Sequence, residues 1–218
     1  MNDDIIALTD ISKIYMKGDA KLIAVDSVSL AIPKGSMVVL TGPSGSGKST
    51  LLYIMAGLMK PSHGEVYIKG ESIYSLPDDS ISRLRKDTIG FVFQAFNLIP
   101  TLTAMENIMA SRIMDKDKRY EKALELLEDL NLSSHKNHLP TELSGGEQQK
   151  IAIARALIND PDIILADEPT GNLDSKNGEK IAAILHGLHS RGKTVIVATH
   201  APKLFKTEGT LNISIVDG

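Results

Sequence analysis

The segment from Gly42 to Ser49 constrains the fold more than any other part of this 218-residue chain. It reads Gly-Pro-Ser-Gly-Ser-Gly-Lys-Ser, which fits the phosphate-loop pattern of a glycine, four residues and then Gly-Lys-Ser. A continuously apolar run at 37–40 precedes it, and an apolar helical run at 51–55 follows it. The pattern requires this strand, turn and helix, so the sequence predicts a phosphate-binding loop rather than a glycine-rich turn with an incidental lysine.

The residue types in this loop have chemical reasons. Glycines let backbone N–H groups curl around phosphate oxygens, and the helix N-terminus adds partial positive charge. Lys48 is expected to reach the β- and γ-phosphates of a nucleotide, and the Ser49 hydroxyl to ligate Mg²⁺. We therefore assign nucleotide binding to Gly42, Pro43, Ser44, Gly45, Ser46, Gly47, Lys48, Ser49 and Thr50.

Two carboxylates follow another buried strand. Residues 163–166 are Ile-Ile-Leu-Ala, and Asp167 and Glu168 come directly after them. Successive side chains at a strand end point to opposite sides, so the two acids have different surroundings. Asp167 is expected to hold Mg²⁺ through its water shell, and Glu168 to face the γ-phosphate and polarise the attacking water. Without the phosphate loop, the pair would equally fit two solvated acids at a strand end.

A second glycine loop, at 143–147, reads Leu-Ser-Gly-Gly-Glu and contains no lysine. It precedes a helical segment that ends near residue 158, so the Ser144 hydroxyl and the free N–H groups at Gly145 and Gly146 would form an anion site. The alternative is an ordinary helix cap with extra glycines. One chain thus supplies one and a half nucleotide sites, and the simplest completion is a second copy in which opposite loops face each other.

Apolar periodicity predicts an α/β P-loop fold with a mostly parallel central sheet, an N-terminal antiparallel β subdomain and a helical insert. Residues 37–40, 163–166 and 195–198 are continuously apolar and are separated by helical stretches, as in a parallel sheet covered by helices. Alternating apolar residues at 28–32 and 66–68 predict half-buried antiparallel strands.

The stretch from 95 to 157 differs, because its apolar residues between 120 and 130 follow helical spacing with charges on the other face. We expect a single domain over 1–218, in which 1–94 and 158–218 form the sheet-containing core and 95–157 the helical insert. Alternation at 211–215 predicts a last strand with no strand after it, since the chain closes on the turn-forming pair Asp217-Gly218.

Composition excludes several classes of protein. The net charge of −3 gives no basic field for nucleic acid or an anionic membrane surface. Cysteine is absent, which excludes disulfides and thiolate metal sites. The acidic start at 1–4 has no apolar run typical of a secretory signal, and no segment reaches the roughly 20 apolar residues of a membrane span. If the protein acts at a membrane, a partner provides the span.

Two further residues, Gln94 and His200, stand at strand ends. Gln94 follows the apolar run 91–93 and could touch Mg²⁺ or the lytic water, and His200 could contact the γ-phosphate. Spacing alone favours an ordinary surface glutamine and an ordinary strand-end histidine.

At the residues that follow the second loop, Gln148 to Leu157, the chain resembles the ATP-binding subunits of ABC transporters. The resemblance extends from Ile5 to about Val216, with the family's motifs in the family's order. These are Walker A at Gly42–Thr50, the Q-loop at Gln94, the signature at Leu143–Glu147, Walker B at Ile163–Asp167 followed by Glu168, the D-loop at Asn172–Asp174, and the switch histidine His200.

The resemblance implies an ATPase that uses ATP and Mg²⁺ and works as a nucleotide-sandwich homodimer. It makes Glu168 the general base, His200 a γ-phosphate contact, and Gln94 a contact of Mg²⁺ or the lytic water. The residues Ser144, Gly145 and Gly146 would bind the γ-phosphate held by the opposite chain.

Two further positions follow from the resemblance. Asp174 would bridge the two active sites. Tyr15 stands where the family often places an aromatic that stacks on adenine, although Tyr15 fits equally well as a strand residue packed on the sheet edge.

Subfamily detail at 91–103 and 167–174 resembles the macrolide-export, lipoprotein-release and cell-division group (MacB/LolD/FtsE-like). This resemblance implies a separate integral-membrane permease, often in a mechanotransmission system, with the ATPase bound peripherally to the cytoplasmic face of the membrane. The residues expected to receive the permease's coupling helix, or else to be ordinary insert core, are Phe96, Leu98, Ile99, Pro100 and Leu102.

Two departures from the family pattern stand near these motifs. Ala201 replaces the usual acid after the histidine, and Lys150 replaces the commoner arginine and loses its bidentate fork. Three other functions remain as alternatives: an importer subunit, a soluble ABC ATPase coupled to nucleic acid, and a non-hydrolysing ATP-binding module. Intact Glu168 and His200 argue against the last, and the missing basic patch argues against the second.

Overall fold

A five-stranded parallel sheet forms the centre of the molecule, with the strand order β6–β7–β8–β3–β9. The computed structural model describes residues 4–18, 20–110 and 116–216. The three continuously apolar runs form β3 (Met37–Thr41), β7 (Ile163–Asp167) and β8 (Thr194–Ala198), as predicted. The edge strands are β6 (Ile89–Val92) and β9 (Leu211–Ser214).

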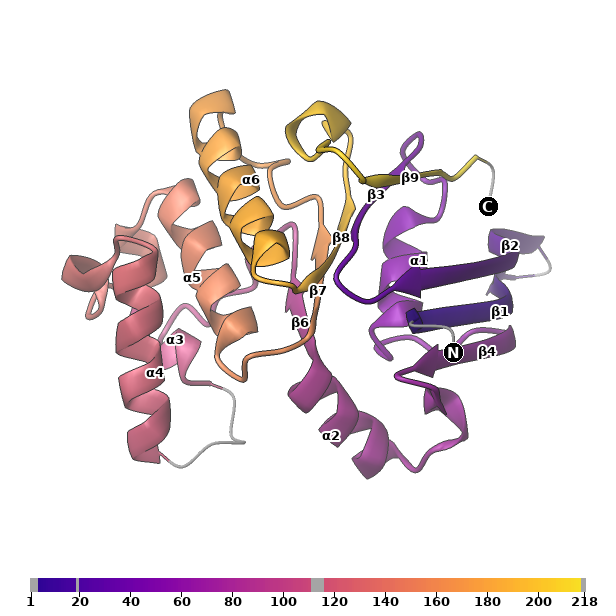
Figure 1. Cartoon of the computed structure of the whole chain (residues 1–218), viewed down its shortest axis with the longest axis horizontal. Helices are drawn as coiled ribbons and strands as arrows, with labels where there is room; N and C mark the ends of the chain where they lie inside the picture. The colour runs from indigo at the N-terminus through magenta and orange to yellow at the C-terminus, as the bar shows by residue number, and fades with distance from the viewer. Residues whose placement is uncertain (1–3, 19, 111–115, 217–218) are drawn as a thin grey trace.

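Alternate residues of these strands enter two different cores. Val38 and Leu40 belong to the core that contains α1 (Lys48–Met55), whereas Val39 belongs to the core that contains α5 (Gly145–Leu157) and α6 (Ser175–Ser190). Both faces of the parallel sheet are therefore covered, which explains why its strands are apolar without alternation. Figure 1 shows α1 between this sheet and the β1–β2–β4 layer, with α5 and α6 on the other side.

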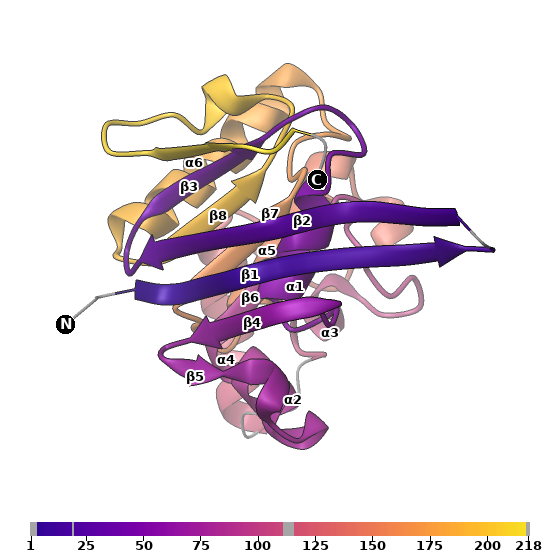
Figure 2. The same cartoon turned by 90° about the vertical axis from the view of Figure 1, so that its right-hand side faces the viewer.

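The second sheet is antiparallel and has the order β2–β1–β4–β5. Its long strands β1 (Asp4–Lys17) and β2 (Ala20–Pro33) lie side by side in Figure 2, with β4 (His63–Ile68) next to β1. The short β5 (Glu71–Ser72) completes it. The alternation at 28–32 and 66–68 correctly predicted two of these strands.

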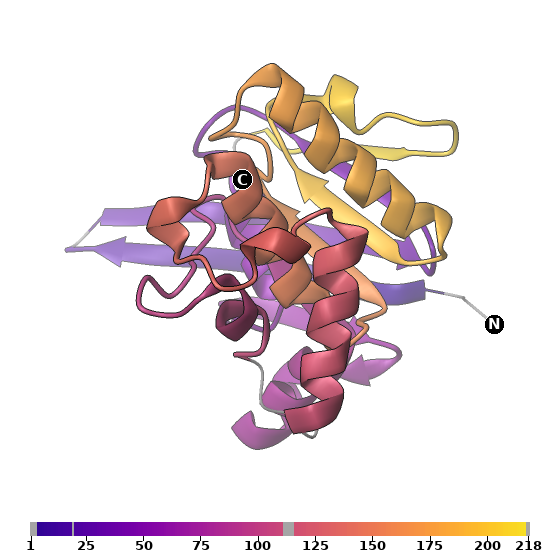
Figure 3. The same cartoon turned by 90° about the vertical axis from the view of Figure 1, so that its left-hand side faces the viewer.

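Helices dominate the chain between β6 and β7. α3 (Ala104–Ile108) and α4 (Lys116–Asp129) precede α5, and Figure 3 shows α4, α5 and α6 on the same side of the molecule. The predicted helix at 120–130 is α4. α2 (Asp78–Thr88), which precedes β6, was not predicted. Short 3-10 turns lie at Ile73–Ser75, Ser133–His135, Pro140–Glu142 and Pro202–Leu204.

The last strand pairs with a segment far earlier in the chain. β9 lies parallel to β3, with Leu211 opposite Val38 and Ser214 opposite Thr41. The alternation at 211–215 predicted the strand but not this pairing, because β9 is an edge strand with one side open. The pair Asp217-Gly218 lies outside the described residues.

Candidate active site

Four neighbouring strands of the parallel sheet end at predicted site residues. β3 leads into the phosphate loop, β7 into Asp167 and Glu168, β8 into His200, and β6 into Gln94. Because these strands are parallel and adjacent, their carboxyl ends lie at one edge of the sheet. This edge is where open α/β sheets bind ligands.

The glycines of the phosphate loop are required by its backbone and its close neighbours. Gly47 has φ +96°, and a Cβ atom there would lie 2.0 Å from the carbonyl oxygen of Ala24. Gly42 has φ +152°, and its Cβ would lie 2.1 Å from the carbonyl oxygen of Ile215. Gly45 also has a positive φ, +81°, but no heavy atom within 4 Å of its Cβ position. The loop therefore packs closely against the backbone of Ala24 in β2 on one side and of Ile215, just after β9, on the other.

This difference predicts unequal costs for two alanine substitutions. Gly45→Ala is expected to cost about 1–2 kcal/mol of unfolding free energy, because only the left-handed backbone is strained. Gly47→Ala adds a backbone collision and should cost more than about 3 kcal/mol or displace β2. Denaturant unfolding of both variants tests the comparison, and equal costs would contradict it.

Lys48 and Ser49 connect the loop to its surroundings. Lys48 is buried, at 5% exposure, and its ammonium donates to the carbonyl oxygens of Gly42 and Pro43, each at 2.9 Å. The Ser49 hydroxyl donates to Oδ1 of Asp167 at 2.8 Å. A hydroxyl and a carboxylate in contact beside a phosphate loop fit Mg²⁺, which prefers oxygen ligands.

Tyr53 is a neighbour of Asp167 that the sequence analysis did not identify. Burial raises the pKa of its hydroxyl, and the negative charge and hydrogen bond of Asp167 raise this pKa further. Tyr53 lies four residues after Ser49 in α1, and residues at this spacing share a helix face. The spacing would have predicted that Tyr53 lies near whatever Ser49 contacts.

Glu168 and His200 lie in contact. Oε2 of Glu168 accepts from the backbone N–H of His200 at 3.2 Å, and Oε1 lies 3.4 Å from the imidazole Nε2. The Glu168 side chain is 12% exposed, and Oε1 has no hydrogen-bond donor among the described residues. The same imidazole nitrogen lies 3.5 Å from the Ser44 hydroxyl of the phosphate loop. Glu168 also has φ +45°, an uncommon value for a residue with a side chain.

The second glycine loop begins α5 but does not reach the phosphate loop of its own chain. Ser144 is the N-cap, and its hydroxyl and backbone N–H donate to Oε2 of Glu147 at 2.7 and 2.8 Å. The atoms nearest the Cβ positions of Gly145 and Gly146 belong to Leu173, Phe96, Asn172 and Asn177. The structure therefore brings this loop next to the Q-loop and D-loop, not to Lys48.

The other predicted site residues, Asp174, Gln94 and Tyr15, each contact a different part of the chain. Asp174 is the N-cap of α6, and hydrogen bonds from the backbone and side chain of Asn177 lower the pKa of its carboxyl. The Gln94 amide lies near Gly171, whose Cβ position is 3.4 Å from Nε2. The Tyr15 hydroxyl donates to Sδ of Met59 at 2.9 Å. This contact fits the alternative in which Tyr15 is a strand residue packed on the sheet edge. The Tyr15 side chain is half-buried, so only part of its ring is accessible to a ligand.

Arg155 ties α5 to the Q-loop. Its guanidinium donates to the carbonyl oxygens of Phe96, at 2.8 Å, and Asn97. Both acceptor residues have left-handed backbones, with φ +58° and +50°. Burial lowers the pKa of Arg155, yet the group stays protonated at any physiological pH. Gln149, fully buried, donates to the carbonyl oxygen of Pro169 and ties α5 to the segment after β7.

The two departures from the family pattern have local partners. The Lys150 ammonium donates to the carbonyl oxygen of Leu130 at 2.9 Å, just past the end of α4. The N–H of Ala201 donates to Oγ1 of Thr199 at 2.9 Å, so the turn after β8 keeps a hydrogen bond.

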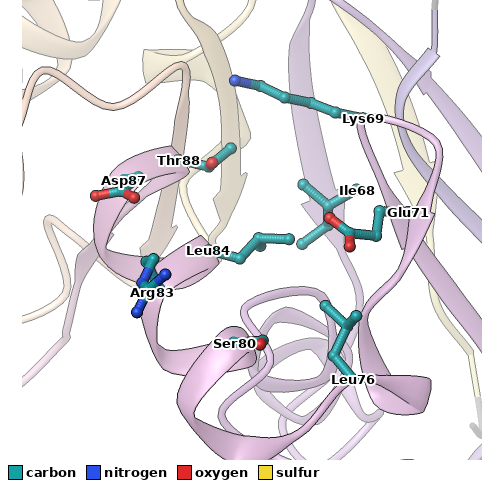
Figure 4. A pocket seen from close by; sticks show the side chains of 9 residues that line it. All are labelled: Ile68, Lys69, Glu71, Leu76, Ser80, Arg83, Leu84, Asp87 and Thr88. Atoms are coloured by element: carbon teal, nitrogen blue, oxygen red, sulfur yellow. The ribbon is translucent and has the colours of Figure 1, made fainter.

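The hollows in the described part of the chain include two that lie outside the nucleotide edge. A groove of about 260 Å³ runs between the ends of α1, α2 and α5. The residues that line it are Ala56, Leu58, Arg85, Lys86, Ile89, Gly90, Phe91, Phe93, Arg155, Ala156 and Asn159. A second hollow, of about 320 Å³, lies between β4, β5 and α2, where Leu84 and Ile68 point toward one another and charges of both signs form the rim (Figure 4).

The residues expected to receive a coupling helix lie elsewhere, because none of them lines the first groove. Phe96 lies against Gly145, Leu98 packs on the core of the helical stretch, and Ile99 is 43% exposed. Phe96 and Asn97 both have left-handed backbones, which the sequence did not reveal.

The family match and the sequence relatives of this chain all point to ABC transporter ATP-binding proteins. Residues 25–171 match the family described as ABC transporter. An ABC transporter ATP-binding protein of Thermotoga maritima is 46% identical over 98% of this chain and 92% of that protein. The macrolide export ATP-binding/permease protein MacB of Escherichia coli is 44% identical over 98% of this chain, which spans 33% of MacB.

A solved structure agrees with the sequence relatives. The dimeric post-hydrolysis cassette MJ0796, of Methanocaldococcus jannaschii, bound to ADP and Pi, has a TM-score of 0.88 and 46% identity, covering 98% of this chain and 95% of that one. Among the residues that the structure describes, no helix is long and apolar enough to cross a membrane. The chain belongs to the ATP-binding cassette ATPases of the ABC transporter family.

Proposed function

We propose that this chain binds and hydrolyses ATP as a nucleotide-sandwich homodimer and drives a separate membrane permease. The observation that carries the proposal is the division of the site. Lys48, Asp167, Glu168 and His200 gather at one edge of the sheet, whereas Gly145, next to Ser144, lies beside the D-loop of its own chain. A second copy would bring its Ser144 loop to the phosphates held by Lys48.

The proposed reaction uses these groups in order. Lys48 exchanges its two loop carbonyls for phosphate oxygens, since an ammonium is a better partner for phosphate than for neutral carbonyls. Ser49 and Asp167 would hold Mg²⁺, with Gln94 as a further ligand, and the metal would neutralise charge on the β- and γ-phosphates. Thr50 and Ser46 complete the loop around the phosphates.

Glu168 accepts the proton of the attacking water. Its Oε1 is buried and free of hydrogen-bond donors among the described residues, so a water placed there would find an available acceptor. His200 joins Glu168 to Ser44 and would contact the γ-phosphate, Asp174 would bridge the two sites of the dimer, and Tyr15 would stack on adenine.

We also propose an exporter or mechanotransmission role, with the 95–157 stretch as the signature-bearing subdomain. The resemblance to MacB, an export protein by name, supports this direction over an importer. The groove between α1, α2 and α5 is the proposed docking place for the permease, because Arg155 in its wall also holds the Q-loop. Localisation at the cytoplasmic face of a membrane would follow from that docking.

The docking proposal predicts a separation of activities. Leu58 lines the groove and is 48% exposed. The variant Leu58→Glu should abolish recovery of the permease in a mild-detergent pull-down from native membranes. ATP hydrolysis by the isolated chain should change less than about twofold, because surface substitutions cost little stability. The matched control is Leu124→Glu on α4, where the leucine is 36% exposed. Equal recovery with both variants would contradict docking in this groove.

A further inference from the structure

The capping glutamate of α5 creates an electrostatic problem for the function proposed above. Oε2 of Glu147 accepts both the N–H and the hydroxyl of Ser144, so a full negative charge lies at the helix end that would meet a phosphate. These hydrogen bonds lower the pKa of Glu147, which keeps the carboxylate ionised. A carboxylate there stabilises the helix but repels a second anion.

His135 lies where it can offset this charge. Its Nε2 is 3.4 Å from Oε1 of Glu147, the carboxylate oxygen that Ser144 does not use. The imidazole is held in place by Ser134, whose hydroxyl lies 3.1 Å from Nδ1, and by His138, whose ring packs edge-on at 5.1 Å. Both partners of the pair are about two-thirds or more buried, with side-chain exposures of 27% and 32%.

The other charged groups around this pair are occupied elsewhere. Lys150, one turn along α5, lowers the pKa of Glu147 only as a minor cause, and its ammonium is bonded to the carbonyl oxygen of Leu130. From α3, Glu106 is bonded to Thr103. His138 is the other titratable neighbour, and its ring faces His135 rather than the carboxylate. His135 is thus the cation-forming group in ion-pair contact with Glu147.

We propose that His135 is a positioning residue of the Ser144 loop: when protonated, it neutralises Glu147 and favours docking of Ser144 on the nucleotide held by the partner chain. The inference rests on the proposed homodimer. Dimerisation is expected to be stronger when residue 135 carries a positive charge, which a comparison of low and high pH tests. Glu147 remains as the cap, and the Ser144 hydroxyl turns from the carboxylate to the phosphate.

The test compares variants in a Glu168→Gln chain, which accumulates the ATP-bound state. The ATP concentration that gives half-maximal dimer is measured by sedimentation at pH 6.0 and 8.0 in low salt. With His135→Gln this concentration should be about threefold higher than in the parent at pH 6.0 and equal to it at pH 8.0, the size expected for one charge at a helix end. His135→Arg should match the protonated parent at both pH values.

Two controls isolate the interaction. His63→Gln, on exposed β4, should keep the pH profile of the parent, because its imidazole lies on the other sheet. In a chain that also carries Glu147→Gln, which can still form a capping box, His135→Gln should have no effect. Titration of ATP itself is common to all variants and cancels in the comparison.

Two results would overturn the inference. His135→Gln with the pH profile of the parent would show that the charge on residue 135 does not matter, and an equal loss at pH 6.0 and 8.0 would assign His135 to packing alone. Either result leaves the homodimer standing. A parent that never dimerises with ATP would instead overturn the proposed function and this inference together.

Discussion

Replacing Glu168 by Gln is expected to reduce ATP hydrolysis by about 100- to 10,000-fold, the range for loss of a general base. The amide keeps the size of the side chain but cannot take a proton from water. Oε1 of Glu168 is buried, and the imidazole Nε2 of His200 lies 3.4 Å from it, so His200 is the neighbouring base that the variant retains. ATP affinity should change less than about threefold, because the glutamate acts on the water rather than on the nucleotide.

The measurement is steady-state phosphate release with nucleotide binding measured on the same preparation. Glu179→Gln, an exposed acid on α6, is the matched control and should leave both quantities unchanged. Brisk hydrolysis by the Glu168→Gln chain would remove Glu168 as the base and direct attention to the neighbouring Asp167 or His200.

Replacing Lys48 by Ala is expected to weaken ATP binding by about 10- to 100-fold, the equivalent of one or two charge-assisted hydrogen bonds. The ammonium is the one side-chain cation that the described loop 42–49 contributes, and it is already directed at the loop carbonyls. Calorimetric titration with ATP tests the expectation.

The control for this variant is Lys34→Ala, an exposed lysine before β3 that should leave ATP affinity intact. Denaturant unfolding of the Lys48→Ala chain is needed as well, because the carbonyls of Gly42 and Pro43 lose their donor and the fold loses about 1 kcal/mol. Unchanged ATP affinity in a folded Lys48→Ala chain would contradict the assignment of the phosphate loop.

The parallel sheet could be predicted from the sequence because burial on both faces leaves an uninterrupted apolar run. Residues 37–40, 163–166 and 195–198 all became central strands. Edge strands carry less of this signal, which is why the partner of β9 was not predicted. The helix α2 was missed because its sequence is strongly polar and only Ile81 and Thr88 of it are buried, so it offers few apolar residues from which a helix could be recognised.

Within the site, residues tied to one local motif were easier to predict than those defined by tertiary contact. Glu168 and His200 follow neighbouring strands and lie in contact, and Asp167 is paired with Ala198 on the same two strands. The bond from Arg155 to Phe96 spans 59 residues and ends on a left-handed backbone, and neither property can be read from spacing.

The most direct test of the composite site is the mass of the Glu168→Gln chain in solution with and without ATP. We predict a shift from the mass of one chain, 23.6 kDa, to that of two chains when ATP is added. Adding Ser144→Asp, which retains a good N-cap but places a carboxylate at the phosphate, should keep the chain monomeric. A Glu168→Gln chain that binds ATP yet stays monomeric at saturation would contradict the composite site.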